Sequence, residues 1–111
     1  MTLLEYAVQA EDTAIYPGKD SFAGLTYSAL KLNGEAGEVA ETVGKINRDK
    51  HSVMGYTDRE QLLLELGDVL WYIANGAREL GYTLEEVAYA NLSKLADRKA
   101  RAVLSGSGDN R

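Results

Sequence analysis

The sequence contains no cysteine and a single histidine, which excludes disulfides, thiolate metal sites, cysteine nucleophiles and multi-histidine zinc sites. Any metal must therefore be a hard cation bound by oxygen ligands. No apolar run approaches the roughly 20 residues that span a bilayer, and residues 1–12 lack the basic and apolar stretches of a signal peptide. We therefore expect a cytoplasmic protein.

Positive charge is in short supply, with 12 Lys and Arg residues against 17 Asp and Glu residues and a net charge of -5. This balance argues against non-specific binding to nucleic-acid polymers or to an anionic membrane, and favours a small-molecule partner. A length of 111 residues, with 45% hydrophobic and 26% charged residues, fits one compact domain. We place this helical domain at residues 1–104, followed by a glycine-rich polar tail at residues 105–111.

Proline occurs once, and apolar residues recur at intervals of three and four, so we predict an all-α protein. Three of the predicted helices open with the spacing of a capping box, in which a Thr is followed three residues later by a Glu: Thr2 and Glu5, Thr57 and Glu60, Thr83 and Glu86. Gly81 is expected to close the third helix. The four helices are predicted at residues 2–15, 25–48, 57–80 and 83–104.

The predicted third helix is apolar around most of its circumference, which is typical of a buried helix. Four helices of one short chain cannot easily bury it, so we expect a four-helix bundle that is completed by dimerisation. Gly37 and Gly44 share a side of the second helix, where each costs roughly 1 kcal/mol relative to alanine. Close approach of a helix across the dimer interface would offset that cost; the alternative is that these glycines are merely tolerated.

Two acidic pairs lie on successive helices, Glu35 with Glu38 and Glu65 with Asp68. Residues three apart on a helix are separated by roughly 60° around the axis, so each pair projects from one flank. If the two helices pack antiparallel, the four carboxylates gather at the edge of the core, where their repulsion favours binding of a cation such as Mg²⁺. The alternative is that each pair only solvates a helix flank or forms surface salt bridges.

The predicted fourth helix carries Asn91, Lys94 and Arg98 near one flank, with Arg101 close by. Cations and an amide opposite a metal cluster suit an oligophosphate, because they bind phosphate oxygens that the metal does not reach. A basic last turn is equally well explained by the helix dipole.

The stretch "GEAGEVAE" followed by "LLLELGDVLWYI" resembles the E-x-x-E and E-x-x-D motifs of the MazG-like all-α nucleoside triphosphate pyrophosphohydrolases, with 26 residues between Glu38 and Glu65. The terminal "NLSKLADRKARAVLSGSGDNR" is also similar to single-domain members. The resemblance implies a MazG-type helical fold, homodimers or homotetramers, and cleavage of (d)NTP to (d)NMP and pyrophosphate with Mg²⁺, or alternatively Mn²⁺, in nucleotide-pool housecleaning.

Carried over to this sequence, the resemblance makes the two acidic pairs the metal ligands and catalytic residues, and implies four substrate-binding residues: Lys31, Tyr72, Asn91 and Lys94. A water oriented by a carboxylate is hypothesised to attack a phosphorus at the α–β bridge. Alternatives are a specialised dUTP or dCTP pyrophosphatase, and a non-catalytic metal-stabilised oligomerisation module. All four acidic positions are filled, which favours an enzyme.

Overall fold

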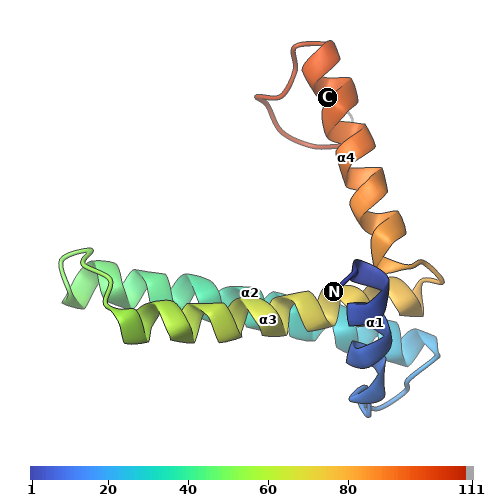
Figure 1. Ribbon diagram of the computed structural model, residues 1–111, viewed down its shortest axis with the longest axis horizontal. Helices are drawn as coiled ribbons and strands as arrows, with labels where there is room; N and C mark the ends of the chain where they lie inside the picture. Colours follow the sequence, from blue (N-terminus) through green and yellow to red (C-terminus); the bar gives the residue numbers. More distant parts are fainter. Residues whose placement is uncertain (110–111) are drawn as a thin grey trace.

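A computed structural model describes residues 1–109, which contain four helices and no strand: α1 (Leu3–Asp12), α2 (Phe22–Asp49), α3 (Tyr56–Glu79) and α4 (Leu84–Ala100). Helices α2 and α3 run antiparallel as one long hairpin (Figure 1). Helix α1 lies across the hairpin near the end where α2 begins, and α4 leaves that end at a steep angle (Figure 1). The all-α prediction is confirmed, and residues 110–111 of the predicted tail lie outside the described residues.

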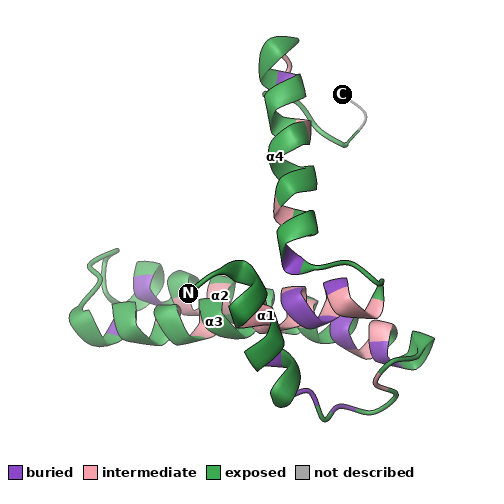
Figure 2. Cartoon of the chain, turned by 45° about the vertical axis from the view of Figure 1, so that its right-hand side comes forward, coloured by how far each residue is buried: buried purple, intermediate pink, exposed green. Residues whose placement is uncertain are grey.

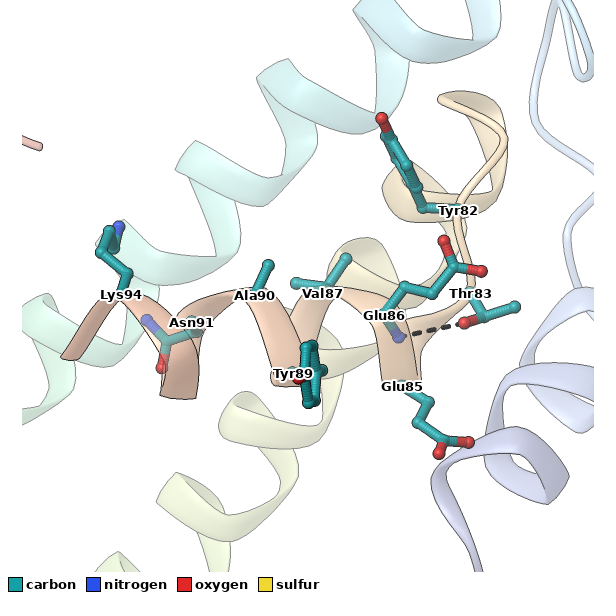
Figure 3. Close-up of a pocket in the computed structure, with 9 residues that line it drawn as sticks. All are labelled: Tyr82, Thr83, Glu85, Glu86, Val87, Tyr89, Ala90, Asn91 and Lys94. Carbon is teal, nitrogen blue, oxygen red and sulfur yellow. Dashed lines mark hydrogen bonds between the residues drawn. The ribbon is translucent and has the colours of Figure 1, made fainter. Parts of the chain in front are cut away.

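Two of the predicted helix starts rest on the expected threonines. The Thr2 hydroxyl accepts a hydrogen bond from the Glu5 backbone N–H at 3.0 Å, and the Glu5 carboxylate accepts one from the Thr2 N–H at 3.0 Å. This is a complete capping box, as predicted. At the start of α4 the Thr83 hydroxyl accepts from the Glu86 N–H at 3.0 Å, drawn as a dashed line in Figure 3.

The capping box predicted at Thr57 and Glu60 is wrong, because α3 begins at Tyr56. The carboxylate of Asp58 accepts a hydrogen bond from the Gly55 backbone N–H at 2.9 Å and also pairs with the Lys50 ammonium at 2.7 Å. A charged residue with two partners in the connection therefore fixes this helix start, and Thr57 lies within the helix.

Helices α1 and α4 each end earlier than predicted. After Asp12, the Thr13 hydroxyl donates to the Ala10 carbonyl at 3.2 Å, so that a side chain satisfies a terminal carbonyl of α1. After Ala100, Ala102 adopts a positive φ of 57°, and the Val103 N–H bonds to the Arg98 carbonyl at 2.9 Å. Helix α1 therefore ends in a side-chain cap, and α4 ends where the chain turns back along α4 itself.

The core lies where α1, α3 and α4 meet, around Ala10, Ala74 and Leu84 (Figure 2). Tyr6, Ala7, Trp71 and Ile73 pack against this cluster. The Asn75 side chain, 1% exposed, donates to the Trp71 carbonyl at 3.2 Å and the Ala10 carbonyl at 3.4 Å, so it ties α1 to α3.

The loop between α1 and α2 is fixed by charged groups at the end of α3. Glu79, whose side chain is 1% exposed, accepts hydrogen bonds from the Tyr16 hydroxyl and from the Asp20 backbone N–H, the second at 3.1 Å. Arg78 donates to Tyr16 at 2.6 Å and forms an ion pair with Asp20. Burial alone would raise the pKa of Glu79, but these hydrogen bonds and the Arg78 charge together lower it below its ordinary value.

The expected four-helix bundle is not closed within one chain. Nowhere in residues 1–109 do Cα atoms of α2 and α4 come within 8 Å of each other, and the molecule extends over 43 × 42 × 28 Å. Leu63 and Leu64 on α3 are 68% and 72% exposed, so the burial expected for this helix is not reached either (Figure 2). Over the described part of the chain, no helix combines the length and the apolarity that crossing a membrane requires.

Candidate active site

The α2–α3 hairpin brings Glu38 and Asp68 close enough to Glu35 for their charges to act on it. Glu35, on α2, is half-buried, and its pKa is raised by burial first and then by the negative charges of Glu38 and Asp68. The positive charge of Lys31 acts in the opposite direction on the same group. The charges of Glu38, Asp68 and Lys31 therefore all act on Glu35.

Glu65, the fourth carboxylate, is held further along the hairpin. Its Oε1 accepts a hydrogen bond from the Thr42 hydroxyl at 2.8 Å and another from the Gln61 amide at 3.0 Å. Its Oε2 is buried and has no hydrogen-bond partner within residues 1–109. One oxygen is thus oriented by α2 and α3, while the other is desolvated without a hydrogen bond to compensate for it.

A recess of about 340 Å³ opens beside the carboxylates and is lined by Thr13, Glu35, Asp68, Trp71 and Tyr72. The Trp71 indole N–H donates to the Thr13 hydroxyl at 2.8 Å, and its ring meets that of Tyr72 edge to face at 4.8 Å. Burial raises the pKa of Tyr72, and so do Tyr27 and the nearby carboxylates, so the phenol stays protonated and can donate a hydrogen bond. The recess combines an aromatic wall with two carboxylates.

Asn91 and Lys94 do not join this recess. They line a wider groove of about 1130 Å³ along α4, together with Tyr82, Val87 and Tyr89 (Figure 3), and none of the four predicted carboxylates borders it. Within one chain the predicted substrate-binding residues therefore fall into two groups, with Lys31 and Tyr72 beside the carboxylates and Asn91 and Lys94 on α4.

The predicted metal ligands have the right chemistry for a hard cation but are not gathered into a closed site. No three carboxylate or imidazole side chains among residues 1–109 converge closely enough to hold one metal ion. A bound cation would nevertheless offset the repulsion at Glu35 and give a partner to the Glu65 oxygen that lacks a hydrogen bond. The assignment of Glu35, Glu38, Glu65 and Asp68 as ligands stays a prediction.

Two residues of this region were missed from the sequence. Thr13 was placed inside the first helix, although it follows the helix end and anchors Trp71. Gln61 lies four residues before Glu65 on the same helix, a spacing that brings their side chains together and was an available signal.

Comparison with known proteins assigns the family. The model of the MazG nucleotide pyrophosphohydrolase domain matches residues 25–103, which include both acidic pairs and all of α3 and α4. The chain is also 51% identical over 109 residues to the Gene 37 protein of Mycobacterium phage L5, with 96% of each chain covered. No solved structure gives a significant match. Because the family model spans more than half of the chain, the protein belongs to the MazG nucleotide pyrophosphohydrolase domain family.

Proposed function

We propose that the protein is a divalent-metal-dependent nucleoside triphosphate pyrophosphohydrolase that converts (d)NTP to (d)NMP and pyrophosphate and so serves nucleotide-pool housecleaning. The observation that carries this proposal is the neighbourhood of Glu35, Glu38 and Asp68 beside the aromatic recess, within the segment that matches the family. Family membership supports a nucleotide as the substrate and hydrolysis as the reaction.

Glu35, Glu38, Glu65 and Asp68 would hold Mg²⁺ or Mn²⁺, which supplies positive charge against the triphosphate. Trp71 and Tyr72 offer an aromatic wall to the nucleoside, and the protonated Tyr72 hydroxyl is available as a donor. A water oriented by one of the carboxylates attacks a phosphorus at the α–β bridge. The bond from the attacked phosphorus to the bridging oxygen breaks, and monophosphate and pyrophosphate are released.

We further propose that a second copy of the chain completes the site, in a homodimer or homotetramer. Support comes from the exposed leucines of α3 and from the separation of Asn91 and Lys94 from the carboxylates. Helix α2 also has room for a neighbour, because a Cβ atom added at Gly37 would meet no heavy atom within 4 Å. In the proposed oligomer, α4 of one copy supplies its asparagine and lysine to the acidic pairs of another.

Gly37→Ala tests the oligomer. In an isolated chain this change fills open space and stabilises the helix by about 1 kcal/mol. If a partner helix packs closely on this face, the added methyl group instead weakens association, which sedimentation velocity detects as a shift toward monomer. An unchanged assembly with a raised Tm would refute close packing at this glycine.

Activity is tested with the purified protein, Mg²⁺ and a panel of canonical and modified nucleoside triphosphates, with products separated by ion-exchange chromatography. We expect monophosphate plus pyrophosphate, lost with EDTA and in Glu38→Gln. Glu60→Gln is the matched control, because Glu60 is an exposed carboxylate of α3 outside the acidic pairs. Diphosphate plus phosphate as products, or full activity in Glu38→Gln, would overturn the proposal.

A further inference from the structure

The C-terminal segment folds back along α4 and covers an arginine. Residues 101–109 reverse direction after Ala100, and the Val103 N–H bonds to the Arg98 carbonyl at 2.9 Å. Arg98 is only 3% exposed, although most of α4 lies open to solvent (Figure 2). An arginine is rarely this buried without a carboxylate or phosphate partner, so its surroundings indicate an anion site.

The anion present is the carboxylate of Asp109. Its Oδ1 bonds to the Lys94 ammonium at 2.8 Å and to the Arg98 guanidinium at 3.1 Å. The Gly108 carbonyl accepts a further bond from Arg98 at 3.3 Å. The Nε of Arg98 is buried without a partner among residues 1–109, so the guanidinium has donor capacity that residues 101–109 do not use.

The ion pairs of Lys94 and Arg98 with Asp109 can hold an anion, but they hold Asp109 only weakly. Hydrogen bonds from Lys94 and Arg98 lower the pKa of Asp109, which keeps it ionised, yet its side chain is 79% exposed. Exposed ion pairs contribute little and exchange readily. A phosphate group carries more charge and more acceptor oxygens than one carboxylate, so it is the stronger ligand for the same two cations.

We propose that Lys94 and Arg98 form a two-cation site for the oligophosphate of the substrate, and that Asp109 occupies this site as an internal competitor until phosphate displaces the tail. The role of Lys94 rests on the proposed function. Arg98, which the sequence already places on the flank of Lys94, becomes the second cation of this site, and Asp109 competes with the substrate for both cations. If the ion pairs of Asp109 only held residues 101–109 against α4, removing the Asp109 charge would not improve anion binding.

Calorimetric titration with tripolyphosphate in EDTA tests the competition without requiring turnover. We expect Asp109→Asn in the full chain to bind tripolyphosphate roughly two- to tenfold more tightly than the wild type, since it loses one exposed competitor with two ion pairs. Asp97→Asn is the matched control, because Asp97 is an exposed carboxylate of α4, the helix that carries Lys94 and Arg98, and it pairs instead with Arg101 at 2.8 Å. Like Asp109→Asn, this control removes one negative charge, and it should give a smaller gain in affinity for tripolyphosphate.

Second-site variants show whether the gain passes through the two cations. Lys94→Gln and Arg98→Gln, each in the Asp109→Asn background, should lose the tighter binding of tripolyphosphate. Circular dichroism checks that these variants fold. The Lys94→Gln variant should fold, because Lys94 is partly exposed. Equal or weaker binding by Asp109→Asn, an equal gain in Asp97→Asn, or a gain that survives Lys94→Gln would overturn the inference.

Nucleotide turnover separates this inference from the proposed function. In Asp109→Asn the KM for the best nucleoside triphosphate should fall while kcat stays the same, because the tail competes with binding only. If no nucleotide is cleaved by any variant, the proposed function fails, and the tripolyphosphate titration still decides whether Asp109 competes for Lys94 and Arg98.

Discussion

Replacing Glu35 with glutamine should stabilise the metal-free protein, although Glu35 is a proposed catalytic residue. Its pKa is raised by burial and by the charges of Glu38 and Asp68, so the folded chain holds a proton there more tightly than the unfolded chain does. Stability is therefore lost as the pH rises from the ordinary glutamate pKa through the raised value. At neutral pH the ionised group destabilises the fold, and glutamine removes the charge while keeping the shape.

The effect combines the cost of burying the charge, which is the largest cause, with two like-charge contacts near the surface, and the nearby Lys31 reduces it. Contacts between exposed charges contribute about 0.2–1 kcal/mol each, so the sum is about 1 kcal/mol, or an increase of about 4 °C in Tm for a chain of this size. Thermal melts followed by circular dichroism in EDTA, from pH 5 to pH 8, measure this. The difference between Glu35→Gln and the wild type should shrink toward the acidic end.

Glu41→Gln provides the control, because Glu41 lies on the same helix and pairs with Lys45 at 3.0 Å. Removing that exposed i, i+4 pair should lower stability by about 0.3–0.5 kcal/mol, the opposite sign. Adding Mg²⁺ should raise the Tm of the wild type more than that of Glu35→Gln. A lower Tm for Glu35→Gln in EDTA would refute the electrostatic reasoning, and an equal Mg²⁺ response would refute Glu35 as a ligand.

Further predictions concern the anchored loop. Glu79→Gln should lower stability by about 2 kcal/mol in urea unfolding, because it leaves Arg78 beside a neutral partner in a half-buried network. The pKa of Glu79 is lowered, so the stability that Glu79 contributes is present above the ordinary glutamate pKa and is lost as the pH falls through the lowered value. In melts from pH 2 to pH 5, the variant should therefore lose less stability on acidification than the wild type. Gly24→Ala should cost about 1–3 kcal/mol, because its Cβ would lie 2.5 Å from the Gly18 carbonyl, whereas Gly34→Ala meets open space and should not destabilise.

Helical period and cap chemistry were enough to predict the four helices, and the errors have local causes. The threonine caps at Thr2 and Thr83 act between residues three apart, so the sequence contains the whole interaction. The start of α3 depends instead on Asp58 meeting Lys50 across the connection. The end of α4 depends on the path of residues 101–109, which the spacing of residues within the helix does not predict.

The acidic neighbourhood was predictable for a similar reason. A short connection forces α2 and α3 to pack antiparallel, and the three-residue spacing places each pair on one flank. The register of the hairpin was not predictable, yet it decides which groups meet. It places Thr42 against Glu65, and it brings Asp68 near Glu35, so the four carboxylates spread along the hairpin rather than converging at one point.

The direction of α4 is the largest departure from the expected bundle, and it links the apolar surface to the site. Periodicity identifies the apolar side of a helix but not the surface that covers it. Leu92 is 66% exposed on α4, and its neighbours Asn91 and Lys94 line the groove away from the carboxylates. In the proposed oligomer, the same contact through α4 would bury this leucine and bring the two polar side chains to an acidic pair of another copy. A variant that disrupts such an assembly through α4 should therefore lose nucleotide binding along with the oligomer.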